Sequence, residues 1–146
     1  MNGTFPMVSL GGLSTELTIL LLSCILGFIQ LTLASSVLTA ERGARWNMGP
    51  RDEVMPPPGK LAGRLERAYR NFMETFPYFA AAILAAAITG RQGMATALGA
   101  ELYLLARIIY VPLYAFGVTG LRTLCYLFGA IGLFLVIAGV FHPGIR

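Results

Sequence analysis

One segment of this chain carries side chains that could bind a ligand, although it opens a long apolar helix. Four polar residues at helical positions i, i+3, i+4 and i+7 share one helix face: Arg67, Arg70, Asn71 and Glu74. Charged side chains inside a membrane are costly, so they usually face the protein interior, where they pair or bind a ligand. Arginines at the membrane edge can instead extend toward lipid headgroups. That alternative suits Arg64 and Arg67, which lie near the membrane edge, but it explains the shorter Asn71 and Glu74 poorly.

A second polar stripe lies within a later apolar run. Its members, at i, i+4, i+7 and i+11, are Tyr103, Arg107, Tyr110 and Tyr114. Arg107 stands well inside that run, so we expect its guanidinium to face the interior of the bundle. The stripe is then the polar wall of a ligand cavity, a structural site in which Glu74 of the neighbouring helix neutralises Arg107, or both.

The third polar group opens the last apolar run. Arg122 and Tyr126 are four residues apart on the expected helix, and Thr123 lies beside them. Taken alone, Arg122 could simply mark the membrane interface. All three polar groups, however, lie toward the same half of the membrane. That coincidence favours one shared pocket over three unrelated features.

Such a pocket would suit a small molecule with several charges. Guanidinium groups bind carboxylates through paired hydrogen bonds, and a carboxylate beside an amide suits an ammonium group. The side chains therefore predict a peptide-like zwitterion with additional carboxylates. A metal ion is not expected, because the single histidine, His142, lies in the C-terminal tail and Cys24 and Cys125 lack a metal-binding spacing.

The elements that position these residues follow from the composition. Of the 146 residues, 56% are hydrophobic and only 12% are charged, and the mean hydropathy is +0.70. A soluble domain carries roughly twice that charged fraction, whereas about 20 apolar residues cross a bilayer as a helix. We therefore predict an all-α integral membrane protein, with residues 1–146 forming one four-helix transmembrane bundle. The predicted spans are residues 17–40, 61–89, 94–116 and 121–141.

The proline-rich segment 41–60 is predicted to be a loop. By the positive-inside rule, the cationic character of this region places the loop in the cytoplasm and both termini outside. The same rule accounts for the net charge of +4 without nucleic-acid binding. Seven of the 11 basic residues lie in the loop or just after it: Arg42, Arg45, Arg51, Lys60, Arg64, Arg67 and Arg70.

Three motifs, in this order on four spans, resemble those of a known family. The motifs RAYRNFMET, ARIIYVPLY and LRTLCY are similar to those of the MAPEG family, the membrane-associated proteins in eicosanoid and glutathione metabolism. The resemblance covers roughly residues 15–140. The loop motif GPRDE at 49–53 is more similar to the bacterial branch, which implies a bacterial inner-membrane protein.

The resemblance implies a homotrimer that binds glutathione, as co-substrate, between neighbouring subunits near the cytoplasmic side. It also implies that Arg122 stabilises the glutathione thiolate, with Thr123 and Tyr126 nearby. This role is chemically sensible, because a close cation favours the nucleophilic thiolate over the thiol. The remaining glutathione contacts would come from Arg67, Arg70, Asn71, Glu74, Arg107, Tyr110 and Tyr114.

The implied function is a glutathione transferase or peroxidase that acts on lipophilic electrophiles from the bilayer. One departure bears on catalysis, because the eicosanoid synthases use an arginine in the first helix and residues 17–40 contain none. Gln30, Ser35, Ser36 or Arg42 could take its place. The alternative is a non-catalytic protein with the same fold, which binds lipid or serves as an accessory subunit of a membrane complex.

Overall fold

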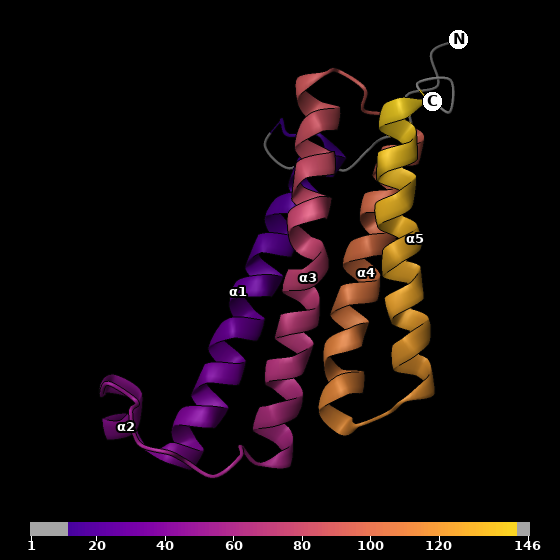
Figure 1. The fold of residues 1–146 in the computed structure, drawn as a ribbon. Helices are drawn as coiled ribbons and strands as arrows, with labels where there is room; N and C mark the ends of the chain where they lie inside the picture. Colours follow the sequence, from indigo (N-terminus) through magenta and orange to yellow (C-terminus); the bar gives the residue numbers. More distant parts are fainter. Residues whose placement is uncertain (1–11, 143–146) are drawn as a thin grey trace.

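Four long helices lie side by side and form the bundle of this protein (Figure 1). The structure is a computed structural model that describes residues 12–142. All four helices are long and apolar enough to cross a membrane. The predicted all-α, four-helix membrane bundle is thus confirmed, and the chain is an integral, multi-pass membrane protein. The four helices are α1 (Thr15–Arg42), α3 (Lys60–Ile88), α4 (Met94–Phe116) and α5 (Gly120–Phe141).

The ends of these helices have local causes. Helix α1 begins two residues earlier than predicted because Ser14 caps it, and the Ser14 hydroxyl oxygen accepts a hydrogen bond from the Leu17 N–H at 3.3 Å. Helix α3 begins at Lys60, one residue after a run of three prolines that favours extended backbone. Helix α4 ends at Phe116 because Gly117 caps it, with a φ of 78° that is a left-handed conformation glycine adopts without strain.

The predicted loop at 41–60 contains one short helix, α2 (Ala44–Met48). Two arginines hold it in place. The guanidinium carbons of Arg42 and Arg51 lie 4.5 Å and 5.2 Å from the centroid of the Trp46 ring. Cation–π contacts of this kind fold the segment back on itself. The sequence did not predict α2, because five residues are too few for a periodic pattern.

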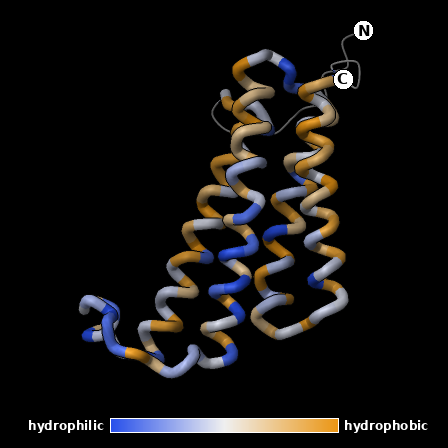
Figure 2. The backbone as a smooth tube through the Cα atoms, viewed as in Figure 1, coloured by the Kyte–Doolittle hydropathy of each residue, from blue (hydrophilic) through white to orange (hydrophobic). Residues whose placement is uncertain are grey.

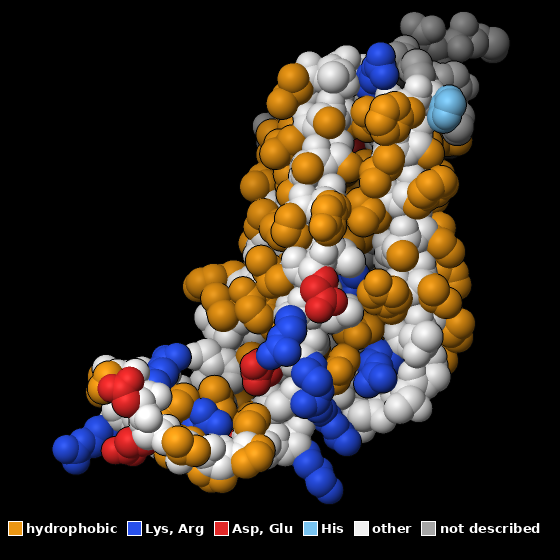
Figure 3. Space-filling model, viewed as in Figure 1, with side chains coloured by type: hydrophobic (Ala, Val, Ile, Leu, Met, Phe, Trp, Pro, Cys, Tyr) orange, Lys and Arg blue, Asp and Glu red, His pale blue; other side chains and the backbone are white. Residues whose placement is uncertain are grey.

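The two ends of the bundle differ in character. Helix α2 and the α4–α5 turn lie at one end, here called the α2 end, while the α3–α4 turn lies at the other (Figure 1). Hydrophilic residues concentrate along the part of α3 nearer the α2 end (Figure 2). Lys and Arg side chains gather over the same end, and most of the surface beyond it is hydrophobic (Figure 3). The polar site must therefore lie in this half.

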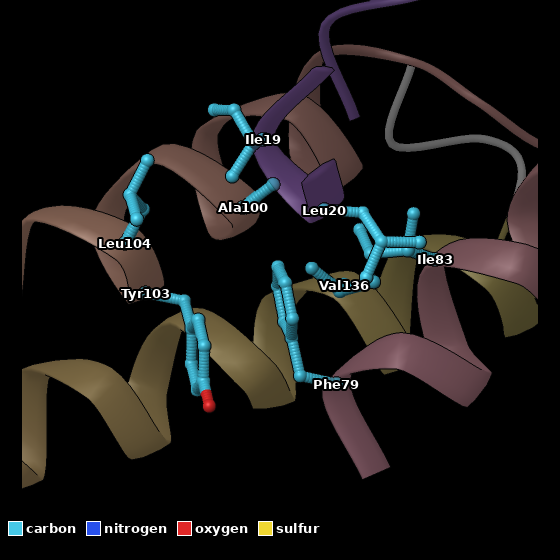
Figure 4. Packing of buried hydrophobic residues seen from close by; sticks show 8 residues of the cluster. All are labelled: Ile19, Leu20, Phe79, Ile83, Ala100, Tyr103, Leu104 and Val136. Carbon is cyan, nitrogen blue, oxygen red and sulfur yellow. The ribbon is translucent and has the colours of Figure 1, made fainter. Parts of the chain in front are cut away.

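The hydrophobic core draws residues from all four long helices (Figure 4). Phe79 of α3 stacks on Tyr103 of α4, with ring centroids 3.9 Å apart and planes inclined by 9°. Tyr103 is fully buried in this cluster. It therefore belongs to the core and not to the cavity wall that its position in the tyrosine stripe predicted. The cluster consists of Ile19, Leu20, Phe79, Ile83, Ala100, Tyr103, Leu104 and Val136.

A buried polar cluster closes the end of the bundle opposite α2. The Glu16 side chain, in the first turn of α1, is only 1% exposed. It accepts hydrogen bonds from the Thr96 hydroxyl at 2.6 Å and from the Gln92 amide at 3.4 Å. These bonds tie the start of α1 to the start of α4 and satisfy a carboxylate that would otherwise be costly to bury.

Glycines allow α4 and α5 to approach closely. A Cβ atom built on Gly132 would lie 2.6 Å from the carbonyl oxygen of Gly99 and 2.7 Å from the backbone nitrogen of Tyr103. A Cβ on Gly99 would meet the Gly132 carbonyl at 2.7 Å. Backbone atoms cannot move aside as a flexible side chain can. The contact therefore requires glycine on both helices, as is common between membrane helices.

We expect Gly132→Ala to destabilise the bundle by about 1–3 kcal/mol, because the added methyl group forces α4 and α5 apart. Thermal unfolding in detergent micelles measures the effect. Gly120→Ala is the matched control, since a Cβ at Gly120 would meet nothing within 4 Å. Equal unfolding temperatures for the two variants would contradict the close approach of the helices.

Candidate functional site

Side chains from three helices line a small hollow of about 220 Å³ in the α2-end half of the bundle. One comes from α3, one from α4 and three from α5, so the three polar groups of the sequence meet at one place. This convergence is what the hypothesis of a shared pocket requires. The lining residues are Asn71, Tyr110, Arg122, Thr123 and Tyr126.

Arg107 lies beside this hollow as a buried cation, with 2% of its surface exposed. Its Nη1 donates to Asn71 Oδ1 at 2.8 Å, and its Nη2 donates to Thr75 Oγ1 at 2.7 Å. The guanidinium carbon also lies 5.4–5.6 Å from three tyrosine ring centroids, those of Tyr103, Tyr110 and Tyr126. Neutral groups therefore hold the charge in a fixed position.

The carboxylate of Glu74 does not contact Arg107. Instead it accepts a hydrogen bond from Asn71 Nδ2 at 3.3 Å, while the other end of the same amide accepts from Arg107. Asn71 thus stands between carboxylate and guanidinium, and the direct pairing of Glu74 with Arg107 is not formed. Within residues 12–142, no carboxylate lies within 4.0 Å of Arg107. Its positive charge is consequently not neutralised by an ion pair in the described chain.

Tyr114 contacts the cations near the hollow but does not line it. The Arg122 guanidinium carbon lies 4.5 Å from the centroid of the Tyr114 ring. Arg67 approaches the same ring at 6.0 Å. The rings of Tyr114 and Tyr110 are 5.5 Å apart at a tilt of 58°. Tyr114 therefore connects the polar face of α3 with Arg122 on α5.

Arg70, like Arg67 and Glu74, does not line the hollow. Its Nη2 lies 2.9 Å from Glu66 Oε1, one turn earlier on α3. Arg70 lines a groove between α1 and α3, not the hollow. Both side chains of this pair are more than half exposed, and such pairs contribute at most about 1 kcal/mol. The pair can therefore open at little cost.

Thr75 takes part in the site, although the sequence analysis did not single it out. Its hydroxyl accepts from Arg107 and is within 3.0 Å of the Tyr103 hydroxyl. The sequence did indicate that Thr75 could contribute to the site, because it lies four residues after Asn71 and so shares its side of the helix. The hydroxyl links the buried cation to the core.

The model of the MAPEG family matches residues 19–142, a range that includes nearly all of the four long helices. The chain belongs to the MAPEG family. No curated protein matches it significantly. MAPEG membership supports a membrane-bound function related to glutathione, of the transferase or peroxidase type or a related one.

This MAPEG protein has no arginine in residues 17–40, and the structure distinguishes the four residues that could take its place. The Gln30 side chain is buried within the protomer, at 4% exposed, without a hydrogen-bond partner in the described chain. Arg42 donates to the Pro56 carbonyl at 3.1 Å and lies over Trp46, so it is held at the α2 segment. Of the four candidates, only Ser35 and Ser36 are exposed, and both lie on α1.

Proposed function

We propose that this MAPEG protein binds glutathione in the hollow and joins its thiolate to lipophilic electrophiles that arrive from the bilayer. One observation carries the proposal, namely the uncompensated positive charge at the site. Arg122 lines the hollow, and Arg107 is buried beside it with only neutral hydrogen-bond partners. A charge in a low-dielectric interior acts strongly on a neighbouring ion. The hollow therefore favours an anion such as a thiolate.

In the proposed reaction, Arg122 stabilises the thiolate, which attacks an electrophilic carbon. A sulfur–carbon bond forms, and the displaced group leaves with the bonding electron pair. The Tyr126 hydroxyl, which lines the same hollow, donates a hydrogen bond to the negative charge that develops on that group. With a lipid hydroperoxide, two glutathiones would be oxidised to the disulfide while the hydroperoxide is reduced to an alcohol and water.

The polar face of α3 suits the peptide part of glutathione. Glu74 is exposed and oriented by Asn71, so its carboxylate is placed for an ammonium group. Arg67 is exposed beside Tyr114 and suits a carboxylate. Tyr110 and Thr123 supply hydroxyls in the hollow itself. Arg70 would join these contacts only after it releases Glu66.

The same face supports a homotrimer with the site at the subunit boundary. Arg67 and Glu74 are exposed on a single protomer, and a neighbouring subunit that covers them would reduce their contact with lipid. In this arrangement α1 of the neighbour would present Ser35 and Ser36 to the site. Native mass spectrometry from detergent should show three chains per particle, and a monomer alone would contradict the proposal.

We further propose that the α2 end faces the cytoplasm of a bacterial cell, with both chain termini outside the inner membrane. The clustering of basic residues at this end supports the orientation. A cysteine introduced at Asp52, with Cys24 and Cys125 replaced, should react with an impermeant maleimide only after the membrane is permeabilised. Reaction in intact cells would reverse the orientation.

Glutathione binding to the detergent-purified protein is the direct test. We expect calorimetry to show a dissociation constant in the millimolar range or below. Glu74→Gln should weaken binding roughly ten-fold or more, because it removes a charged hydrogen-bond acceptor. Glu101→Gln, at an exposed position of α4 outside the hollow, is the control for loss of one carboxylate. If the wild type does not bind glutathione, the non-catalytic alternative is favoured.

A further inference from the structure

A second depression, separate from the hollow, lies between α1 and α3 and opens at the α2 end. Its volume is about 420 Å³. Small residues on the two helices, Ala34 and Ala62, leave space that longer side chains would fill, and both are buried. The floor of this groove is apolar and consists of Leu31, Ala34, Leu38, Ala62 and Met73.

Arg51 connects this groove to a hollow of about 610 Å³ around α2, because it lines both. Its backbone has a φ of 61°, a left-handed conformation found at no other non-glycine residue from 12 to 142. The Arg51 guanidinium donates to Asn47 Oδ1 at 2.6 Å and to the Asn47 carbonyl at 3.1 Å. Backbone conformation and hydrogen bonds together hold this cation at the mouth of the groove.

The mouth of the groove carries excess positive charge. Arg42 and Arg45 line the hollow around α2 together with Arg51. Asp52 and Glu53 line it too, but in the described part of the chain none of these three arginines has a carboxylate within 4.0 Å. The Glu66–Arg70 pair, which also lines the groove, adds no net charge.

We propose that this groove binds one anionic phospholipid. An acyl chain lies on the apolar floor, and the phosphate is bound by Arg51, with Arg42 and Arg45 nearby. Trp46 lines the same hollow around α2, and tryptophan is typical of the membrane–water interface. A free phosphate would contact the arginines but not the apolar floor of the groove. A zwitterionic lipid carries no net negative charge, so it would not neutralise the excess positive charge at the mouth. None of the residues that line the groove lines the proposed glutathione hollow.

Native mass spectrometry tests the site, with the protein in detergent titrated with phosphatidylglycerol or with phosphatidylcholine of the same acyl chains. We expect one tightly retained phosphatidylglycerol per subunit and at least several-fold weaker retention of phosphatidylcholine. Arg51→Gln should reduce phosphatidylglycerol binding about five-fold. Lys60→Gln removes the same charge from an exposed position that lines neither cavity, so it should have less than half that effect.

Ala34→Leu tests the apolar floor separately from the charge. The larger side chain fills the groove, so retention of phosphatidylglycerol should fall although every arginine is kept. Thermal unfolding of each variant shows whether the bundle is intact, and Arg51→Gln alters only an exposed segment. The proposal is overturned by equal binding of the two lipids, by equal effects of Arg51→Gln and Lys60→Gln, or by displacement of the lipid by inorganic phosphate at the same concentration.

Discussion

Arg122→Ala is expected to remove most of the thiolate of bound glutathione at neutral pH while the peptide part of glutathione still binds. A nearby cation lowers the pKa of the glutathione thiol, so the thiolate forms at lower pH in the wild type. Without Arg122, the midpoint of the ultraviolet thiolate absorbance should rise by roughly one to two pH units. The transferase rate at neutral pH should fall by about the same factor as the thiolate fraction.

Two substitutions make this result specific to the site. Arg122→Lys keeps a cation at the hollow and should recover most of the thiolate signal. Arg45→Ala removes a cation that lines the hollow around α2 instead, so the titration should be unchanged. If the thiolate absorbance of Arg122→Ala has the same midpoint pH as that of the wild type, Arg122 has no part in activating the thiol.

Thr75→Val is expected to have the second large effect, although Thr75 does not line the hollow. Valine has almost the same shape but no hydroxyl, so Arg107 Nη2 loses its acceptor and the Tyr103 hydroxyl loses its partner. Each buried polar group left unsatisfied costs about 1–3 kcal/mol. We expect Arg107 to leave its present position, with roughly ten-fold weaker glutathione binding and a higher midpoint of the thiolate titration.

The thiolate titration separates this positioning role from a loss of stability. Thr75→Ser keeps the hydroxyl and should behave as the wild type does. Tyr103→Phe removes only the bond between Thr75 and the core, so thermal stability should fall while the midpoint stays near the wild-type value. A Thr75→Val midpoint equal to that of Thr75→Ser would show that Arg107 needs no help from Thr75.

The sequence alone was sufficient for the four spans and for the polar faces of their helices. A bilayer of fixed thickness requires long apolar runs, so α1, α3, α4 and α5 were visible from composition. Helical periodicity then placed Asn71 on one face of α3, and Arg107 with Tyr110 on one face of α4. The cost of a charge in lipid predicted that Arg107 would turn inward, and it is buried.

Only the tertiary structure decided which of these polar residues touch. Periodicity gives the angle of a residue around its own helix, but a partner on another helix depends on their relative height and rotation. These are set by packing, such as the close approach at Gly132 and the stacking of Phe79 on Tyr103. For that reason Asn71, and not Glu74, receives the hydrogen bond of Arg107.

The same limit explains the other features that the sequence left open. A long side chain such as that of Arg70 can adopt several rotamers. The sequence therefore could not show whether Arg70 pairs with Glu66 or contributes to the hollow. The groove beside Arg51 exists because α1, α3 and the α2 segment meet, although these elements lie apart in the chain. The sequence determined which side chains lie on each face of a helix, and the packing of the helices determined what each residue contacts.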